Sequence, residues 1–297
     1  MLDTVGIGIH VDGLRVSSLL DREWTVHTES SKTESNLWAS CEMGGVRMAY
    51  LAGIAWLGAE TSLPSILGGD NSKLLGGSEC QEALQMLRAV VSAGVGRELP
   101  ELPAWRVSRF DPVWAWLHSP APYIGALGLA RLPRTESVRF GSSVRWVTRG
   151  NRVRARCYDK SQEQGRQVDL ALRFERQVRR RERVRVGDDV IGRSVDDCLN
   201  ERVCLGILRD GLHALGLDRP IPSLQASRAL LVGAYGRRRG RNAWAVLRDV
   251  IECGGVWPGD FSKRDRQRYE SLFRGAGVSV VSPMGELPAL ELPANCL

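Results

Sequence analysis

The chain has 297 residues, of which 43% are hydrophobic and 25% charged, an ordinary composition for a folded protein with one large or two modest domains. Its net charge of +7 is concentrated in arginine-rich segments, so nucleic acid is the expected partner, with a plain solvated basic surface as the alternative. Seven scattered cysteines without a C-x-x-C pair argue against a disulfide framework or a zinc module. With no basic-apolar leader and no apolar run of about 18 residues, we expect no membrane partner and a cytoplasmic location.

Hydrophobic periodicity and turn residues predict the elements of the first half of the chain. Alternation of apolar and small residues is typical of a strand, and a capping box marks a helix start. The expected elements are a strand over 4–11, a helix from the cap Ser78 (with Gln81) to Gly94 with an apolar stripe of Leu84, Leu87, Val90 and Val91, a strand over 105–111 ended by Pro112, and a short helix over 121–131.

The second half changes from strands to helices near residue 190. Its expected elements are a hairpin of strands 138–148 and 152–158 across 149–151, a strand over 169–175, a helix from Ser194 to about 215, and helices over 242–253 and 262–274, the last with Ser262 and Asp265 at its start. The pattern predicts an α+β fold: an antiparallel-sheet catalytic domain with flanking helices over 1–190, followed by a smaller helical accessory region over 191–297.

The segment 152–163 is the candidate centre of the chemistry. Because side chains alternate along a strand, one face carries Arg152, Arg154, Arg156 and Tyr158, while Val153, Ala155 and Cys157 point to a core. Asp159, Lys160 and Glu163 lie just beyond the tyrosine. A row of arginines ending in a tyrosine can hold a phosphodiester and attack it. The alternative is an exposed basic strand whose tyrosine packs at its rim.

Two further strands repeat one pattern, Arg109-Phe110-Asp111 and Arg173-Phe174-Glu175. If these strands are neighbours, Asp111 and Glu175 meet on one face and suit Mg²⁺ or Mn²⁺. The alternative is that each carboxylate forms a salt bridge with a nearby arginine. The four histidines are far apart in sequence, so a metal site must be led by carboxylates. Glu163 is a third ligand, a base, or a solvated loop residue.

These parts suit phosphoryl transfer. A metal would polarise the scissile phosphate, and the hydroxyl of Tyr158 would lose its proton as it attacks. Lys160 and the arginines favour the phenolate electrostatically. The product would be a covalent phosphotyrosine.

Several motifs, in their order and spacing, resemble the gene II replication initiators of filamentous phages and related phage and plasmid replication proteins. They are Met1–Thr4, Leu67–Asn71 with the following helix, Ser108–Asp111, Glu136-Ser137 with Val144–Trp146, Tyr158–Lys160 with Glu163, Leu172–Glu175, and more weakly Tyr235 to Gly254. The chain looks shorter than the best-known members between Lys160 and Arg173.

The resemblance implies a rolling-circle replication initiator with a nicking-endonuclease-like core. Its nicking tyrosine falls on Tyr158 and its acidic metal ligands on Asp111, Glu175 and Glu163. Such a protein nicks double-stranded origin DNA, leaves a 3′-hydroxyl that primes synthesis, and later cuts and rejoins the displaced single-stranded DNA. Host helicase and polymerase, and further copies in a homo-oligomer, are the other implied partners. Tyr123 and Tyr235 are candidates for a second tyrosine by residue type only.

The basic segments then have expected roles. Arg145, Arg149, Arg152, Arg154 and Arg156 would follow the strand near the nick, while Arg173, Arg179, Arg180, Arg181, Arg237, Arg238 and Arg239 would bind DNA phosphates. Trp146 or Trp114 would stack a base, or else belong to the core. Two rival functions remain: a non-enzymatic repressor or packaging factor, and a metal-dependent nuclease whose nucleophile is water.

Overall fold

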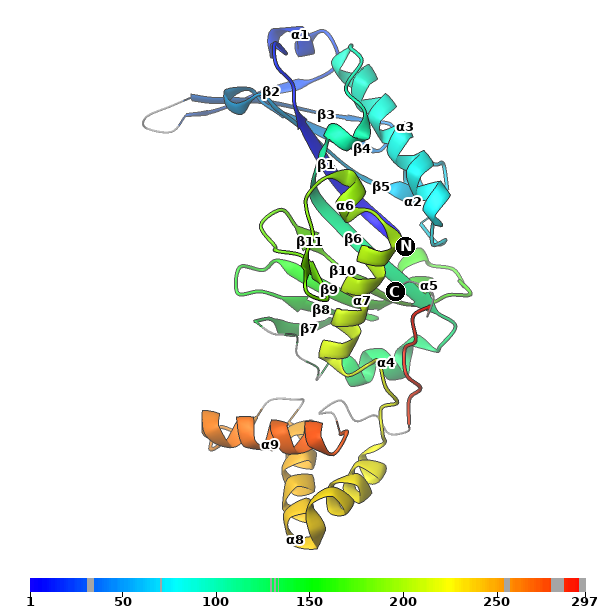
Figure 1. The fold of residues 1–297 in the computed structure, drawn as a ribbon, viewed down its shortest axis with the longest axis vertical. Coiled ribbons are helices and arrows are strands. Elements are labelled where there is room, and N and C mark those ends of the chain that lie inside the picture. The colour runs from blue at the N-terminus through cyan, green and yellow to red at the C-terminus, as the bar shows by residue number, and fades with distance from the viewer. Residues whose placement is uncertain are drawn as a thin grey trace. The chain divides into compact units, whose positions relative to one another are not determined.

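The computed structural model describes residues 1–30, 35–69, 71–128, 130, 132, 134–253, 257–278 and 286–293. Asp70, Gly254 and Cys296, which the motifs or the cysteine count include, lie outside these residues. The chain forms two compact units, each discontinuous in sequence. Figure 1 labels their helices and strands. Unit 1 comprises Met1–Trp114 and Arg176–Leu208, and unit 2 comprises Ala115–Glu175 and Arg209–Pro293. The functional division at residue 190 stays a prediction.

Unit 1 contains an antiparallel sheet in the order β2-β3-β4-β5-β1-β6, with β11 paired to β6. Its strands are β1 (Leu2–His10), β2 (Thr25–Ser30), β3 (Ser35–Met43), β4 (Val46–Leu51), β5 (Trp56–Ser62), β6 (Arg106–Trp116) and β11 (Val178–Arg179), and β12 (Arg185–Val186) pairs with β13 (Asp189–Val190). The helices are α1 (Ser17–Leu20), α2 (Leu63–Ile66), α3 (Gly77–Val95) and α6 (Val195–Cys198), with short 3-10 turns at Ala52–Ile54 and Leu102–Ala104. Helix α7 (Glu201–Leu215) begins in unit 1.

The helix expected from Ser78 to Gly94 exists as α3, but both caps lie two residues away from the prediction. The backbone N–H of Gly76 donates to Glu79 at 2.8 Å, and Gly96 ends the helix with a positive φ of 72°, which glycine adopts without steric cost. Leu84, Leu87 and Val91 are buried as expected. The helix bounds therefore follow the glycines and not the serine.

The expectation that Pro112 ends its strand is wrong, because β6 continues to Trp116. Pro112 lies opposite Leu2 where the register with β1 is irregular. An irregular position needs no N–H from the proline. The next residue, Val113, is hydrogen-bonded again: its N–H donates to the carbonyl of Met1 at 2.8 Å.

Unit 2 contains a second run of strands in the order β10-β9-β8-β7. The strands are β7 (Glu136–Phe140), β8 (Ser143–Val147), β9 (Val153–Asp159) and β10 (Leu172–Arg176), and the helices beside them are α4 (Pro120–Leu127) and α5 (Lys160–Gln164). The predicted single strand 138–148 is two strands, because Gly141, with a φ of 55°, turns the chain between them. The hairpin between β8 and β9 is confirmed.

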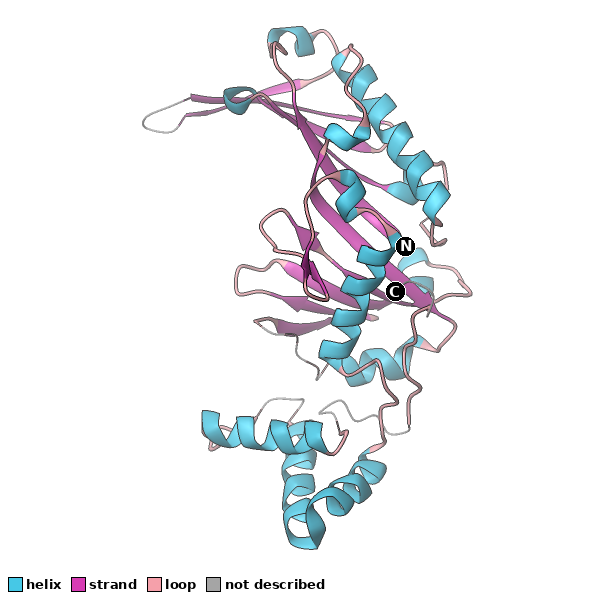
Figure 2. Ribbon diagram, viewed as in Figure 1, coloured by secondary structure: helices cyan, strands magenta, loops and turns pink. Residues whose placement is uncertain are grey.

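The C-terminal region is helical, as predicted, and completes an α+β fold with antiparallel sheet and flanking helices (Figure 2). Helix α8 (Leu224–Glu252) is longer than the expected 242–253, and α9 (Lys263–Gly275) starts at the predicted cap Ser262. The helix expected from Ser194 to 215 is divided into α6 and α7. Within the described residues, no helix has the length and apolar character needed to cross a membrane.

Helix α8 bends sharply at Gly236, whose φ of 76° and ψ of 167° interrupt the helical conformation. The two halves then pack so closely that a Cβ atom on Gly240 would lie 2.5 Å from the carbonyl oxygen of Leu231. α8 and α9 share a hydrophobic cluster that includes Leu247, Trp257 and Phe273. This small core holds the helical region together.

Candidate functional site

The pairing of β8 with β9 builds a pocket around Tyr158. Arg145 lies opposite Arg156, and Ser143 lies opposite Tyr158, so all four side chains share one face of the strands. They line a cavity of about 280 Å³ together with Phe140, Gly141, Ser142, Asp159, Gln162 and Glu163. We call this cavity the tyrosine pocket.

The other face of the same strands is core. Trp146, Ala155 and Cys157 are fully buried, and the Trp146 ring meets Phe174 edge to face at 6.3 Å between centroids. The indole N–H of Trp146 donates to the carbonyl of Ala130 at 2.9 Å. Trp146 is therefore a core residue and not a base-stacking platform. Burial raises the pKa of the Cys157 thiol to about 12.

Two cations contact the aromatic ring of Tyr158. The guanidinium carbon of Arg156 lies 4.3 Å from the ring centroid and the ammonium of Lys160 lies 5.9 Å from it. The tyrosine is only 3% exposed, so these cation–π contacts act in partly desolvated surroundings. The same positive charges would stabilise a phenolate oxygen.

Arg156 is fixed by two carboxylates. Its guanidinium lies 2.6 Å from an oxygen of Glu175, whose side chain is 1% exposed, and 3.3 Å from Glu163. Burial alone would lower the pKa of Arg156, but the charge and hydrogen bond of Glu175, together with Tyr158 and Glu163, outweigh burial and raise the pKa. The salt-bridge alternative for Glu175 therefore holds, with Arg156 of the neighbouring strand as a partner.

Glu163 lies on helix α5 and not in a solvated loop. The side chain of Asp159 caps this helix by accepting from the N–H of Ser161 at 2.9 Å. One turn of helix then brings Glu163 within 2.6 Å of the ammonium of the buried Lys160. Glu163 thus bridges Lys160 and Arg156, the two cations that contact Tyr158.

Asp111 belongs to unit 1 and has an arginine partner of its own. The Nε of Arg109 lies 3.1 Å and 3.0 Å from the two oxygens of Asp111, which is fully buried. A second Arg109 nitrogen lies 2.7 Å from Glu60, a residue of β5 that sequence analysis missed. Glu60 also forms a salt bridge with Arg47 at 2.8 Å. This pair results from the register between β4 and β5, which local sequence does not reveal.

The expected metal ligands do not form a ready-made metal site. No cluster of three histidine, cysteine or acidic side chains suited to a metal occurs among the described residues. Asp111 and Glu175 lie in different units, so their meeting stays a prediction. Both carboxylates bind arginine, and a hard cation would have to displace these guanidinium groups. Binding of Mg²⁺ or Mn²⁺ at these residues therefore stays a prediction.

The predicted DNA-contacting arginines divide by exposure. Most are exposed, and Arg154 and Arg156 are half-buried, whereas Arg173 is only 1% exposed. A buried guanidinium cannot reach a DNA phosphate, so Arg173 is removed from the expected set. The exposed members are Arg145, Arg149, Arg152, Arg179, Arg180, Arg181, Arg237, Arg238 and Arg239.

The two other candidate tyrosines have structural roles. The hydroxyl of Tyr123 donates to the carbonyl of Pro288 at 2.8 Å, and that of Tyr235 donates to Leu272 at 2.9 Å. Burial raises the pKa of Tyr123 to about 12, which opposes formation of its phenolate. Tyr158 is thus the better nucleophile candidate of the three.

Comparisons with solved structures find likenesses to this chain, whereas no protein-family model and no curated protein matches it. The chain is similar to a solved structure of the rolling circle replication initiator protein from Geobacillus stearothermophilus, with a TM-score of 0.33 and 10% sequence identity over 96% of this chain and 98% of that chain. A likeness of this size shows neither family nor activity, and the function must be argued from the site.

Proposed function

We propose that the protein initiates rolling-circle replication by nicking and rejoining origin DNA through Tyr158. The tyrosine pocket carries the proposal: it places a tyrosine, held between Arg156 and Lys160, in a cavity also lined by Arg145. Cations beside a nucleophile can bind a scissile phosphate and stabilise the charge that develops on it.

In the proposed reaction the phenolic oxygen of Tyr158 attacks the phosphorus of one phosphodiester. A tyrosine–phosphate bond forms as the bond to the 3′-oxygen breaks. Glu163, which lines the same pocket, accepts the phenolic proton, and the leaving 3′-oxygen takes a proton from water. Rejoining is the reverse step, in which a 3′-hydroxyl attacks the phosphotyrosine and releases Tyr158.

A divalent metal, Mg²⁺ or Mn²⁺, remains part of the proposal only as a factor to be tested. Asp111, Glu175 and Glu163 are the candidate ligands, and each would have to leave a cationic partner to bind it. We therefore assign no step to a metal. Double-stranded origin DNA and the displaced strand are the proposed substrates, with host helicase and polymerase, a homo-oligomer and a cytoplasmic location as further parts of the proposal.

The decisive experiment uses supercoiled plasmid that carries the replicon encoding this protein, incubated with chelator, Mg²⁺ or Mn²⁺. We expect nicked circles and a covalent protein–DNA adduct whose labelled peptide contains Tyr158. Tyr158→Phe, which keeps the ring and its cation contacts, should lower cleavage by at least about a thousandfold while DNA binding persists.

Two outcomes would reject the proposal. DNA binding without scission under every metal condition would favour a repressor or packaging factor. Nicking by Tyr158→Phe at the normal rate, without an adduct, would favour water as the nucleophile. Loss of all cleavage with chelator would support the metal, and unchanged cleavage would exclude it.

A further inference from the structure

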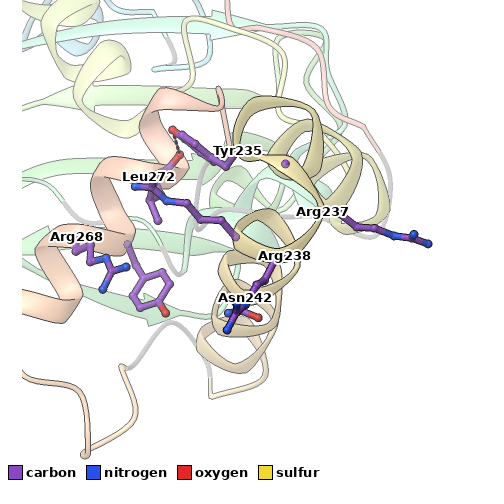
Figure 3. Close-up of a pocket in the computed structure, with 9 residues that line it drawn as sticks. Tyr235, Arg237, Arg238, Asn242, Arg268 and Leu272 are labelled. Atoms are coloured by element: carbon purple, nitrogen blue, oxygen red, sulfur yellow. Dashed lines mark hydrogen bonds between the residues drawn. The ribbon is translucent and has the colours of Figure 1, made fainter.

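A second cavity lies between helices α8 and α9, far along the chain from Tyr158. It has a volume of about 500 Å³ and is lined by Tyr235, Gly236, Arg237, Arg238, Arg239, Asn242, Arg268, Tyr269 and Leu272. We call it the arginine pocket. Figure 3 shows Arg238 and Asn242 on α8, and Arg268 on α9. Arg237 points away from these three side chains (Figure 3).

The charge of this cavity has one sign. Among the described residues, four arginines line it and no aspartate or glutamate does. Guanidinium groups supplied by two helices to one cavity can bind an anion with several oxygen atoms, and phosphate is the anion that their planar donors match best. Asn242, one helical turn from Arg238 on α8, adds a neutral donor and acceptor.

The walls of the arginine pocket are fixed by packing. The hydroxyl of Tyr235 donates to the carbonyl of Leu272 on α9 at 2.9 Å, and Arg239 stacks on the Tyr235 ring at 5.3 Å. The bend at Gly236 sets the direction of the second half of α8. The pocket is therefore preorganised, which lowers the entropic cost of binding a ligand.

An aromatic ring completes the cavity. Tyr269 lines it and is half-buried, with its ring packed against Phe261 and Phe273 at centroid distances of 5.9 Å and 6.2 Å. A ring supported in this way offers a stacking surface, and an unpaired nucleic-acid base stacks on such rings without regard to sequence. A concave pocket accepts an unpaired nucleotide, whereas paired bases are not free to enter it.

We infer that the arginine pocket binds single-stranded DNA, with a backbone phosphate on Arg238 and Arg268 and a base against Tyr269. This inference rests on the proposed function to the extent that nicking and strand displacement supply the single strand. It differs from that function in needing no cleavage. The pocket would hold the displaced strand through contacts independent of Tyr158.

The test measures fluorescence anisotropy of a labelled 20-nucleotide oligo(dT) with the full-length protein in chelator, so that binding is separated from cleavage. We expect Arg238→Ala/Arg268→Ala to weaken binding at least about tenfold and to reduce the slope of log affinity against log salt by about 1.4. Tyr269→Ala should also weaken binding, while Tyr269→Phe should retain it, because the phenyl ring keeps the stacking surface.

The matched control is Arg241→Ala/Arg274→Ala, which removes one exposed arginine from each helix outside the pocket lining. It should change affinity much less. If the two double variants lost the same affinity for oligo(dT), the inference would be overturned. It would also be overturned if Arg238 and Arg268 bound a 20-base-pair duplex more tightly than oligo(dT). Thermal unfolding of each variant identifies any loss caused by misfolding, and Tyr158→Phe should bind oligo(dT) normally even if the nicking proposal fails.

Discussion

The tyrosine pocket and the arginine pocket both collect arginines, but they differ in what balances the charge. In the tyrosine pocket Arg156 is bound by Glu175 and Glu163, and Lys160 by Glu163. In the arginine pocket, none of the described residues that line the cavity is acidic. The first arrangement holds its cations in fixed positions around a tyrosine, and the second leaves them available to an anion.

The difference indicates that one arginine-rich sequence can serve two purposes. Cations locked by carboxylates have a fixed geometry, which is what stabilisation of a transition state requires. Cations in a cavity that no described acidic residue lines have a stronger attraction for phosphate, which is what binding requires. The following predictions test this distinction, in order of decreasing effect.

Glu175→Gln should have the largest effect on stability. It removes the carboxylate that lies closer to Arg156 than Glu163 does, and breaking a buried pair by removing one partner costs about 3–5 kcal/mol. Urea unfolding should show this loss, and cleavage should fall while DNA binding persists. Glu163→Gln is the matched control, since its carboxylate is 38% exposed and should contribute less than about 1 kcal/mol. If both variants lost the same free energy of unfolding, Glu175 would not be the residue that stabilises the tyrosine pocket.

Gly240→Ala should damage the arginine pocket. The new methyl group would lie 2.5 Å from the backbone of Leu231 and Val232, so the two halves of α8 must separate, at a cost of about 1–3 kcal/mol. Because the pocket is distorted when the halves separate, oligo(dT) binding should weaken. Adduct formation at Tyr158 should be retained. Gly233→Ala meets no atom within 4 Å and should bind oligo(dT) like the parent protein. Normal binding by Gly240→Ala would mean that the bend of α8 does not shape the pocket.

A smaller effect is the pH dependence of the free energy of unfolding that comes from Cys157, in the core on the other face of the strands from the tyrosine pocket. Burial raises the pKa of Cys157 from 9.0 to about 12, so the folded state keeps a proton that the unfolded state loses above about pH 9. The free energy of unfolding should therefore be fully retained below pH 9 and fall above it, by at most about 1.4 kcal/mol per pH unit from this thiol. Urea midpoints measured from about pH 8 to 10 test this, and Cys157→Ala should show a shallower decline. If the urea midpoint of Cys157→Ala declined with pH as steeply as that of the parent protein, groups other than Cys157 would be responsible.

Local sequence patterns predicted much of the fold and the faces of the key strand. Alternation in β9 correctly placed Ala155 and Cys157 in the core and Tyr158 on the opposite face, and Ser262 was correctly identified as the cap of α9. Glycines caused most of the errors. Gly141 divides one predicted strand, Gly96 ends α3, and Gly236 bends α8, because a positive φ depends on the path of the chain and not on hydrophobic pattern.

The sequence by itself determined that this is a basic α+β protein, and that a tyrosine ends a row of arginines on one face of a strand. Only the tertiary structure decided which charges meet: Glu175 binds Arg156, and Glu60 binds Arg109. Such partners are chosen by strand pairing and register between distant segments. The arginine pocket likewise depends on the packing of α8 against α9, and neither helix contains it alone.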